Sequence, residues 1–157
     1  MEVLKKSTNG QWSLSKSSLS STDVDSSHHI PYLGGYSNDG KTIYIDSRFP
    51  KTIKGKDGKT IDCHKYLTIH EMTERRLLEA GLDYNASHNI AEATEEAAMR
   101  LDGVDPKDYY GVLYEVYNHT LRDFDPDKVP KDLDLKPYKD DKLTSVVKRI
   151  EEARNAK

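Results

Sequence analysis

The chain has 157 residues, of which 35% are hydrophobic and 32% charged, so its length fits one domain and its polar composition predicts a small core. A formal net charge of −3 excludes a global basic field, and we expect neither nucleic acid nor a membrane as a partner. The single Cys63 excludes an internal disulfide, and no N-terminal apolar run resembles a signal peptide, so the sequence predicts a cytoplasmic protein.

Composition divides the chain into three parts. Residues 1–27 are rich in Ser and show no sustained period, which predicts a flexible arm. Residues 28–124 carry the motifs described below and are expected to form a single metal-site domain. Residues 125–157 begin with a charged stretch that holds three prolines, so they predict an irregular connection followed by a short C-terminal helix.

Two β-hairpins are predicted ahead of the helices. Asn38-Asp39-Gly40 is a strong turn signal between Tyr32–Tyr36 and Lys41–Asp46, and the second of these segments alternates apolar and polar residues. A second turn signal, Gly55-Lys56-Asp57-Gly58, lies between two further short strands. The two hairpins together predict a small antiparallel sheet.

Helical spacing of apolar residues then predicts three helices. The first runs from His64 to Gly81, where glycine is a plausible stop, and the second follows after a short turn and is capped by Asp83 or Asn85. So short a turn makes the two helices antiparallel neighbours. Asp105-Pro106 opens a third helix, whose aromatic stripe is expected to pack in the core. The predicted fold class is therefore α+β, with a small antiparallel sheet of hairpins followed by an antiparallel helical hairpin and a third packing helix.

The first two helices carry the residues with chemical potential. His70-Glu71-Met72-Thr73-Glu74 differs at one position from the zinc motif H-E-x-x-H, in which two histidines bind the metal and the Glu acts as general base. His70 and Glu74 lie one turn apart on a face that also carries Leu67 and Leu77. A carboxylate on an apolar face needs compensation, which a metal ion, an arginine or a hydrogen-bond network can supply.

The residues alone leave the third ligand open. A catalytic zinc needs three protein ligands and one open position, and the second helix offers His88 and Glu95 on one face. Glu95 could instead orient a ligand histidine from behind. The plainest alternative is a charged helix in which Glu71 pairs with Arg75 one turn along.

This arrangement resembles a minimal zincin of the HExxE type, the metallopeptidase-like class in which an active-site helix follows a small sheet. The finer pattern, with YIDSRFP before the motif and GLDY and a Glu-rich helix after it, is similar to uncharacterised proteins of bacterial and phage genomes. The resemblance covers about residues 30–108. It implies that His70 and Glu74 are metal ligands, that His88 or Glu95 completes the set and that Glu71 is the catalytic general base.

The resemblance also carries expectations about substrate and metal. An edge strand before the helix often binds an extended peptide in this class, and Thr42–Asp46 is the strand expected to do so. Glu74 in place of the second histidine departs from the family pattern and makes Fe or Mn acceptable beside Zn. We therefore expect a metal-dependent hydrolase acting on a peptide or protein. The alternative is a non-catalytic, phage-derived protein-binding module with a buried His/Glu polar or metal-stabilised cluster.

Overall fold

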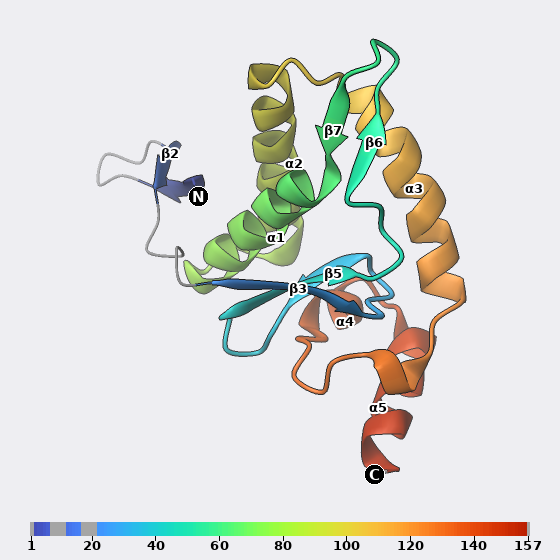
Figure 1. Ribbon diagram of the computed structural model, residues 1–157. Coiled ribbons are helices and arrows are strands. Elements are labelled where there is room, and N and C mark those ends of the chain that lie inside the picture. The colour runs from blue at the N-terminus through green and yellow to red at the C-terminus, as the bar shows by residue number, and fades with distance from the viewer. Residues whose placement is uncertain (1, 7–11, 17–21, 157) are drawn as a thin grey trace.

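The protein is described by a computed structural model, which places residues 2–6, 12–16 and 22–156 (Figure 1). Their order is β1 (Glu2–Lys6), β2 (Trp12–Lys16), β3 (Asp23–His28), β4 (Gly34–Tyr36), β5 (Thr42–Asp46), β6 (Thr52–Lys54), β7 (Thr60–Asp62), α1 (Cys63–Glu79), α2 (Tyr84–Leu101), α3 (Pro106–Arg122), the 3₁₀ turn η2 (Pro126–Lys128), α4 (Lys136–Asp140) and α5 (Thr144–Asn155). The predicted α+β class is confirmed. None of the described helices is long and apolar enough to cross a membrane.

The central sheet is mixed rather than antiparallel, which corrects the sequence prediction. Its strand order is β3-β5-β4, with β4 antiparallel to β5 as expected and β3 parallel to it. β1 and β2 lie within the residues 1–27 that were expected to form a flexible arm, and β3 begins there; the rest of that expectation falls largely on residues 7–11 and 17–21, outside the described residues. The polar and largely exposed residues of β3 carry no alternation that would reveal a strand, since neither face of the strand is fully buried.

β5 is the middle strand of this sheet, so the expectation that Thr42–Asp46 is a substrate-binding edge strand is wrong. The β4–β5 hairpin itself is as predicted, and Gly40 adopts a positive φ of 71° while its N–H donates to the Ser37 carbonyl. β6 and β7 also pair, but they form a separate two-stranded hairpin.

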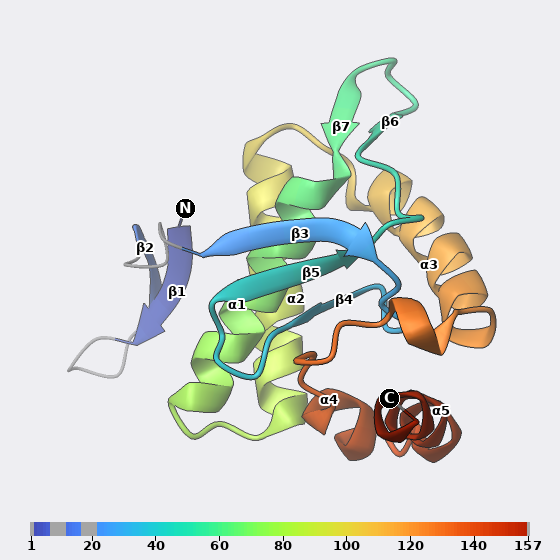
Figure 2. The same ribbon diagram turned by 60° about the horizontal axis from the view of Figure 1, so that its bottom comes forward.

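The helix boundaries follow from their caps. The side chain of Asp62 accepts a hydrogen bond from the Lys65 N–H at the start of α1, and Asp83 rather than Asn85 does the same for α2. Gly81 ends α1 in the left-handed region at φ 97°, and the next N–H reaches back to the Leu77 carbonyl, as in a Schellman motif. α2 consequently folds back along α1 (Figure 2).

The sheet has a core on each face because successive side chains of β5 point to opposite sides. Ile43 and Ile45 face α1 and join clusters that include Met72 and Leu67. Tyr44 faces the other way, into a cluster built largely from the C-terminal segment. β4 pairs with β5 and also contacts α1, the helix that carries His70, Glu71 and Glu74.

The C-terminal segment, residues 125–157, is more regular than predicted. It contains η2, α4 and α5, and its buried side chains form most of the second core. It also lies along the free side of β4, where Leu133 bridges to Ser37 and the Asp134 N–H donates to the Tyr36 carbonyl at 2.9 Å. The segment is thus part of the domain, and it borders the candidate site described next.

Candidate metal centre

α1 and α2 bury the polar residues of the motif between them. His70, Glu71 and Glu74 are 7%, 7% and 3% exposed, although a helix of this amphipathic type usually turns such groups to solvent. They are buried because their face also carries Leu67 and Leu77 and lies between β4 and α2. Glu95 of α2 is 2% exposed and His88 is partly exposed, which puts His88 on the open side of the cluster.

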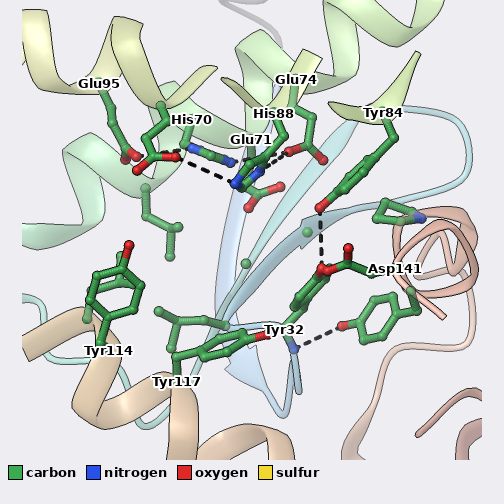
Figure 3. Close-up of a pocket in the computed structure, with 18 of the residues that line it drawn as sticks. Tyr32, His70, Glu71, Glu74, Tyr84, His88, Glu95, Tyr114, Tyr117 and Asp141 are labelled. Carbon is green, nitrogen blue, oxygen red and sulfur yellow. Dashed lines mark hydrogen bonds and ion pairs between the residues drawn. The ribbon is translucent and has the colours of Figure 1, made fainter. Parts of the chain in front are cut away.

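Three of these side chains meet at one point. His70 Nε2 and His88 Nδ1 each lie 3.2 Å from Glu74 Oε2, and the two imidazole rings are 4.8 Å apart (Figure 3). One ligand atom from each of His70, Glu74 and His88 lies within 4.8 Å of the other two, so the group could hold a metal ion. Two imidazoles and a carboxylate suit zinc, iron or manganese.

Glu95 lies behind this group rather than in it. Its Oε1 is 3.1 Å from His70 Nδ1, the ring nitrogen that points away from Glu74, and it also accepts a hydrogen bond from the Tyr110 hydroxyl at 3.0 Å. A carboxylate in this position fixes the tautomer and the ring orientation of a ligand histidine. Of the two candidates left open by the sequence, the geometry therefore places His88 among the ligand atoms and Glu95 behind His70.

Arg75 does not neutralise the buried carboxylates. Its guanidinium pairs with Glu79 at 3.0 Å and with Asp134 at 3.4 Å, so the alternative Glu71–Arg75 pair is not formed. Glu74 is instead held by its two histidines and by the Tyr36 hydroxyl, which donates to Oε1 at 3.2 Å. No hydrogen bond or ion pair of Glu71 is found within the described part of the chain.

The two neighbouring carboxyls are driven to opposite protonation states. Burial, together with the Glu74 charge, raises the pKa of Glu71 to about 8. Burial also acts to raise the pKa of Glu74, but the hydrogen bonds from His70 and His88 outweigh it and lower that pKa to about 2. Without a bound cation, Glu71 is therefore neutral and Glu74 ionised at pH 7, a separation typical of acid–base sites.

His70 carries a proton in the same state. Burial disfavours the charged imidazolium, but the Glu95 charge and the hydrogen bonds to Glu74 and Glu95 outweigh burial and raise the pKa of His70 well above its usual value. A metal ligand must be a neutral imidazole, so a cation that binds here displaces this proton. Glu74 and Glu95, which stabilise the proton on His70, are the same groups that would bind the cation and orient His70, respectively.

A cavity of about 250 Å³ opens over the His/Glu cluster. Beyond the predicted residues, its walls include side chains from the segment beside β4, from two helices and from the C-terminal segment. These are Tyr32 beside β4, Tyr84 of α2, Tyr114 and Tyr117 of α3, and Tyr138 and Asp141 of the C-terminal segment. Sequence reasoning missed these residues as a site. Tyr117 belonged to the predicted aromatic stripe, which was assigned to the core, whereas Tyr114 lay outside that stripe; of the α3 tyrosines only Tyr109 is fully buried.

The arrangement provides three convergent ligand atoms, a carboxyl beside them that has no hydrogen-bond partner among the described residues, and space for a small substrate group. Glu71 is directly covered by β4, since a Cβ built on Gly34 would lie 2.7 Å from Glu71 Oε1. These are the parts that a metal-assisted hydrolase requires.

Comparisons of the chain with protein-family profiles, with curated proteins and with solved structures give no match.

Proposed function

We propose that the protein is a metal-dependent hydrolase of zincin type that cleaves a peptide or amide bond. The observation that carries this proposal is the convergence of His70, Glu74 and His88 within 4.8 Å, at a cavity that is also lined by the buried Glu71 carboxyl. A polar cluster that served packing alone would not need an adjoining cavity. The resemblance of the motif to the zincin pattern agrees with this assignment.

Each side chain has a defined role in the proposal. His70, Glu74 and His88 would hold a divalent cation, which when bound supplies Lewis acidity toward a water and a carbonyl oxygen. Glu71 takes a proton from the attacking water and delivers it to the leaving amine. The raised pKa of Glu71 suits delivery of the proton to the amine. Uptake of the proton from water requires the ionised carboxylate, which the positive charge of a bound cation would favour. Glu95 keeps Nε2 of His70 directed toward the ligand group.

A second candidate function is a protein-binding module in which the cluster serves only as a staple. The observation that favours it is the position of Glu74, whose contacts join α1 to α2 through His88 and to β4 through Tyr36. Such a network can stabilise a fold whether or not it holds a metal. In that case Glu71 has no chemical task.

Metal analysis of the purified protein, followed by a peptide-cleavage assay, separates the two functions. The hydrolase predicts one tightly bound metal per chain, which is lost in His70→Ala and in Glu74→Ala. It also predicts that Glu71→Gln keeps the metal and the fold but loses cleavage by about 10²-fold or more, since general acid–base catalysis contributes about 10²–10⁴-fold. A metal-loaded protein that shows no cleavage would leave the staple as the function, and cleavage unaffected by Glu71→Gln would remove Glu71 as the general base.

A further inference from the structure

The cavity walls combine aromatic rings with acidic groups. Six tyrosines and six carboxylic acids line it, and it has two histidines but neither Lys nor Arg among its lining residues. Acidic residues alone do not make a site. Here they share a cavity with Glu71, which is 7% exposed, has no hydrogen-bond partner among the described residues and extends its carboxyl toward the cavity (Figure 3).

The aromatic rings form a continuous wall that leads away from the metal group. Tyr84 stacks on His88 with ring centroids 5.7 Å apart, and its hydroxyl lies 3.4 Å from the Tyr32 hydroxyl. The Tyr32 ring in turn lies 5.8 Å from that of Tyr117 and 4.9 Å from that of Tyr138. A substrate side chain extending from the metal group along this wall therefore meets aromatic rings, which can attract cations.

Asp141 stands at the far end of the same wall. Asp141, Tyr32 and Tyr84 all line the cavity (Figure 3). The other acid contributed by the C-terminal segment, Asp134, already pairs with Arg75. Asp141 is exposed and has no ion pair among the described residues, so its charge is available to a ligand.

The size of the cavity limits what can enter. A volume of about 250 Å³ lies just below the range of about 300–1,000 Å³ found for pockets that enclose a drug-sized ligand, so it suits a single long side chain rather than an extended peptide. A carboxylate-bearing group that reached Asp141 would meet a like charge there. A neutral apolar chain could pack on the rings but would leave Asp141 without a counterion.

We propose that the cavity is a specificity pocket for a cationic side chain, Lys or Arg, of the peptide substrate, with the charge placed between Asp141 and the rings of Tyr32 and Tyr84. The inference rests on the proposed hydrolase function for its substrate class. Its physical basis is separate, since it depends on the walls of the cavity and not on the metal group.

Binding of three small probes tests the pocket without requiring turnover. The probes are the Nα-acetyl methylamides of lysine, norleucine and glutamate, titrated by NMR into the full-length, zinc-supplemented protein. We expect the lysine probe to bind at least about 10-fold more tightly than the norleucine probe, since a charge pair and cation–π contacts together contribute roughly 1–2 kcal/mol. The glutamate probe should cause no saturable shifts in the residues around Asp141, and any shifts from its carboxylate should be confined to the zinc ligands.

Neighbouring variants localise the effect. Asp141→Asn should weaken the lysine probe about 5-fold and leave the norleucine probe unchanged, whereas Asp140→Asn, one residue away and outside the cavity lining, should change neither. Tyr84→Phe should retain most of the lysine affinity and Tyr84→Leu should lose it, because a cation–π contact requires the aromatic ring and not its hydroxyl. Far-UV circular dichroism verifies that each variant is folded.

The outcomes for the pocket and for the hydrolase are distinguishable. Equal affinities for the lysine and norleucine probes, or equal effects of the Asp140 and Asp141 variants, overturn the pocket. Cleavage that depends on Glu71 but shows no preference for Lys or Arg overturns the pocket while the hydrolase stands. Selective lysine binding that survives Glu71→Gln in a protein without cleavage supports the pocket and removes the hydrolase.

Discussion

Replacing Glu71 by Gln should stabilise the metal-free protein at neutral and alkaline pH. Glu71 is buried, and its pKa is raised to about 8 in the folded state against a usual value of 4.5. An acid of this kind holds its proton in the folded protein and releases it on unfolding. The free energy of unfolding of the wild type therefore falls as pH rises from about 4.5 to about 8, whereas a neutral amide has no such dependence.

The size of the effect follows from the two pKa values. One pKa unit corresponds to about 1.36 kcal/mol, so ionisation of Glu71 in the unfolded chain costs the folded state about 2 kcal/mol at pH 6, about 3 at pH 7 and about 4 at pH 8. Glu71→Gln should recover most of this difference, since glutamine has nearly the same volume and the carboxyl has no hydrogen-bond partner among the described residues to lose. The difference should shrink to less than about 1 kcal/mol at pH 5 and vanish toward pH 4.

Urea unfolding followed by circular dichroism between pH 4.5 and pH 8.5, on protein freed of metal with a chelator, measures the free energy of unfolding of each protein and its dependence on pH. Glu115→Gln on α3 is the matched control, because Glu115 is exposed and its removal should change neither the stability nor its pH dependence. If Glu71→Gln is no more stable than wild type at pH 8 and keeps the same pH slope, the buried carboxyl is not held neutral and the electrostatic account of the site is wrong.

Three further predictions concern the ligand group and its cover. His88→Ala should lower zinc affinity more than 100-fold, while Glu95→Gln should lower it by about 10–100-fold, as measured by chelator competition. Because the raised pKa of His70 makes a proton compete with the cation, zinc affinity should rise with pH across the neutral range, and calorimetry in buffers of different ionisation enthalpy should detect proton release. Gly34→Ala should cost about 1–3 kcal/mol in urea unfolding because its Cβ would lie 2.7 Å from the buried Glu71 Oε1. The control is Gly111→Ala, in an exposed helical position where a Cβ meets nothing within 4 Å, which should stabilise the protein by about 0.5–1 kcal/mol. Equal effects of the two variants would contradict the close approach of β4 to α1.

The helices were predictable because their signals are local. Asp105-Pro106 opens α3 and Gly81 ends α1, and each of these residues acts within one helical turn of its own position. The β4–β5 hairpin was predictable for the same reason, since its turn and both its strands lie within residues 34–46. The convergence of His70 and Glu74 also needs only one turn of helix.

The mixed sheet and the cavity were not predictable because they depend on contacts between distant segments. β3 pairs with β5 across a separation of about 19 residues, so no local turn signal indicates the pairing. The largely exposed residues of β3 also lack the alternation of apolar and polar residues that would identify a strand. Asp141 is brought to the cavity by packing of the C-terminal segment along β4. The choice between His88 and Glu95 needed the rotation of α2 relative to α1, which sequence spacing does not fix.

The ligand group and the cavity are completed at different points along the chain. His70, Glu74 and His88 all belong to the α1–α2 pair, whereas the aromatic and acidic wall is finished only by Tyr138 and Asp141. During synthesis from the N-terminus, the three residues that could hold an ion therefore emerge well before those that complete the cavity wall. The order of the sequence makes the His/Glu cluster an early product of translation and the complete cavity a late one.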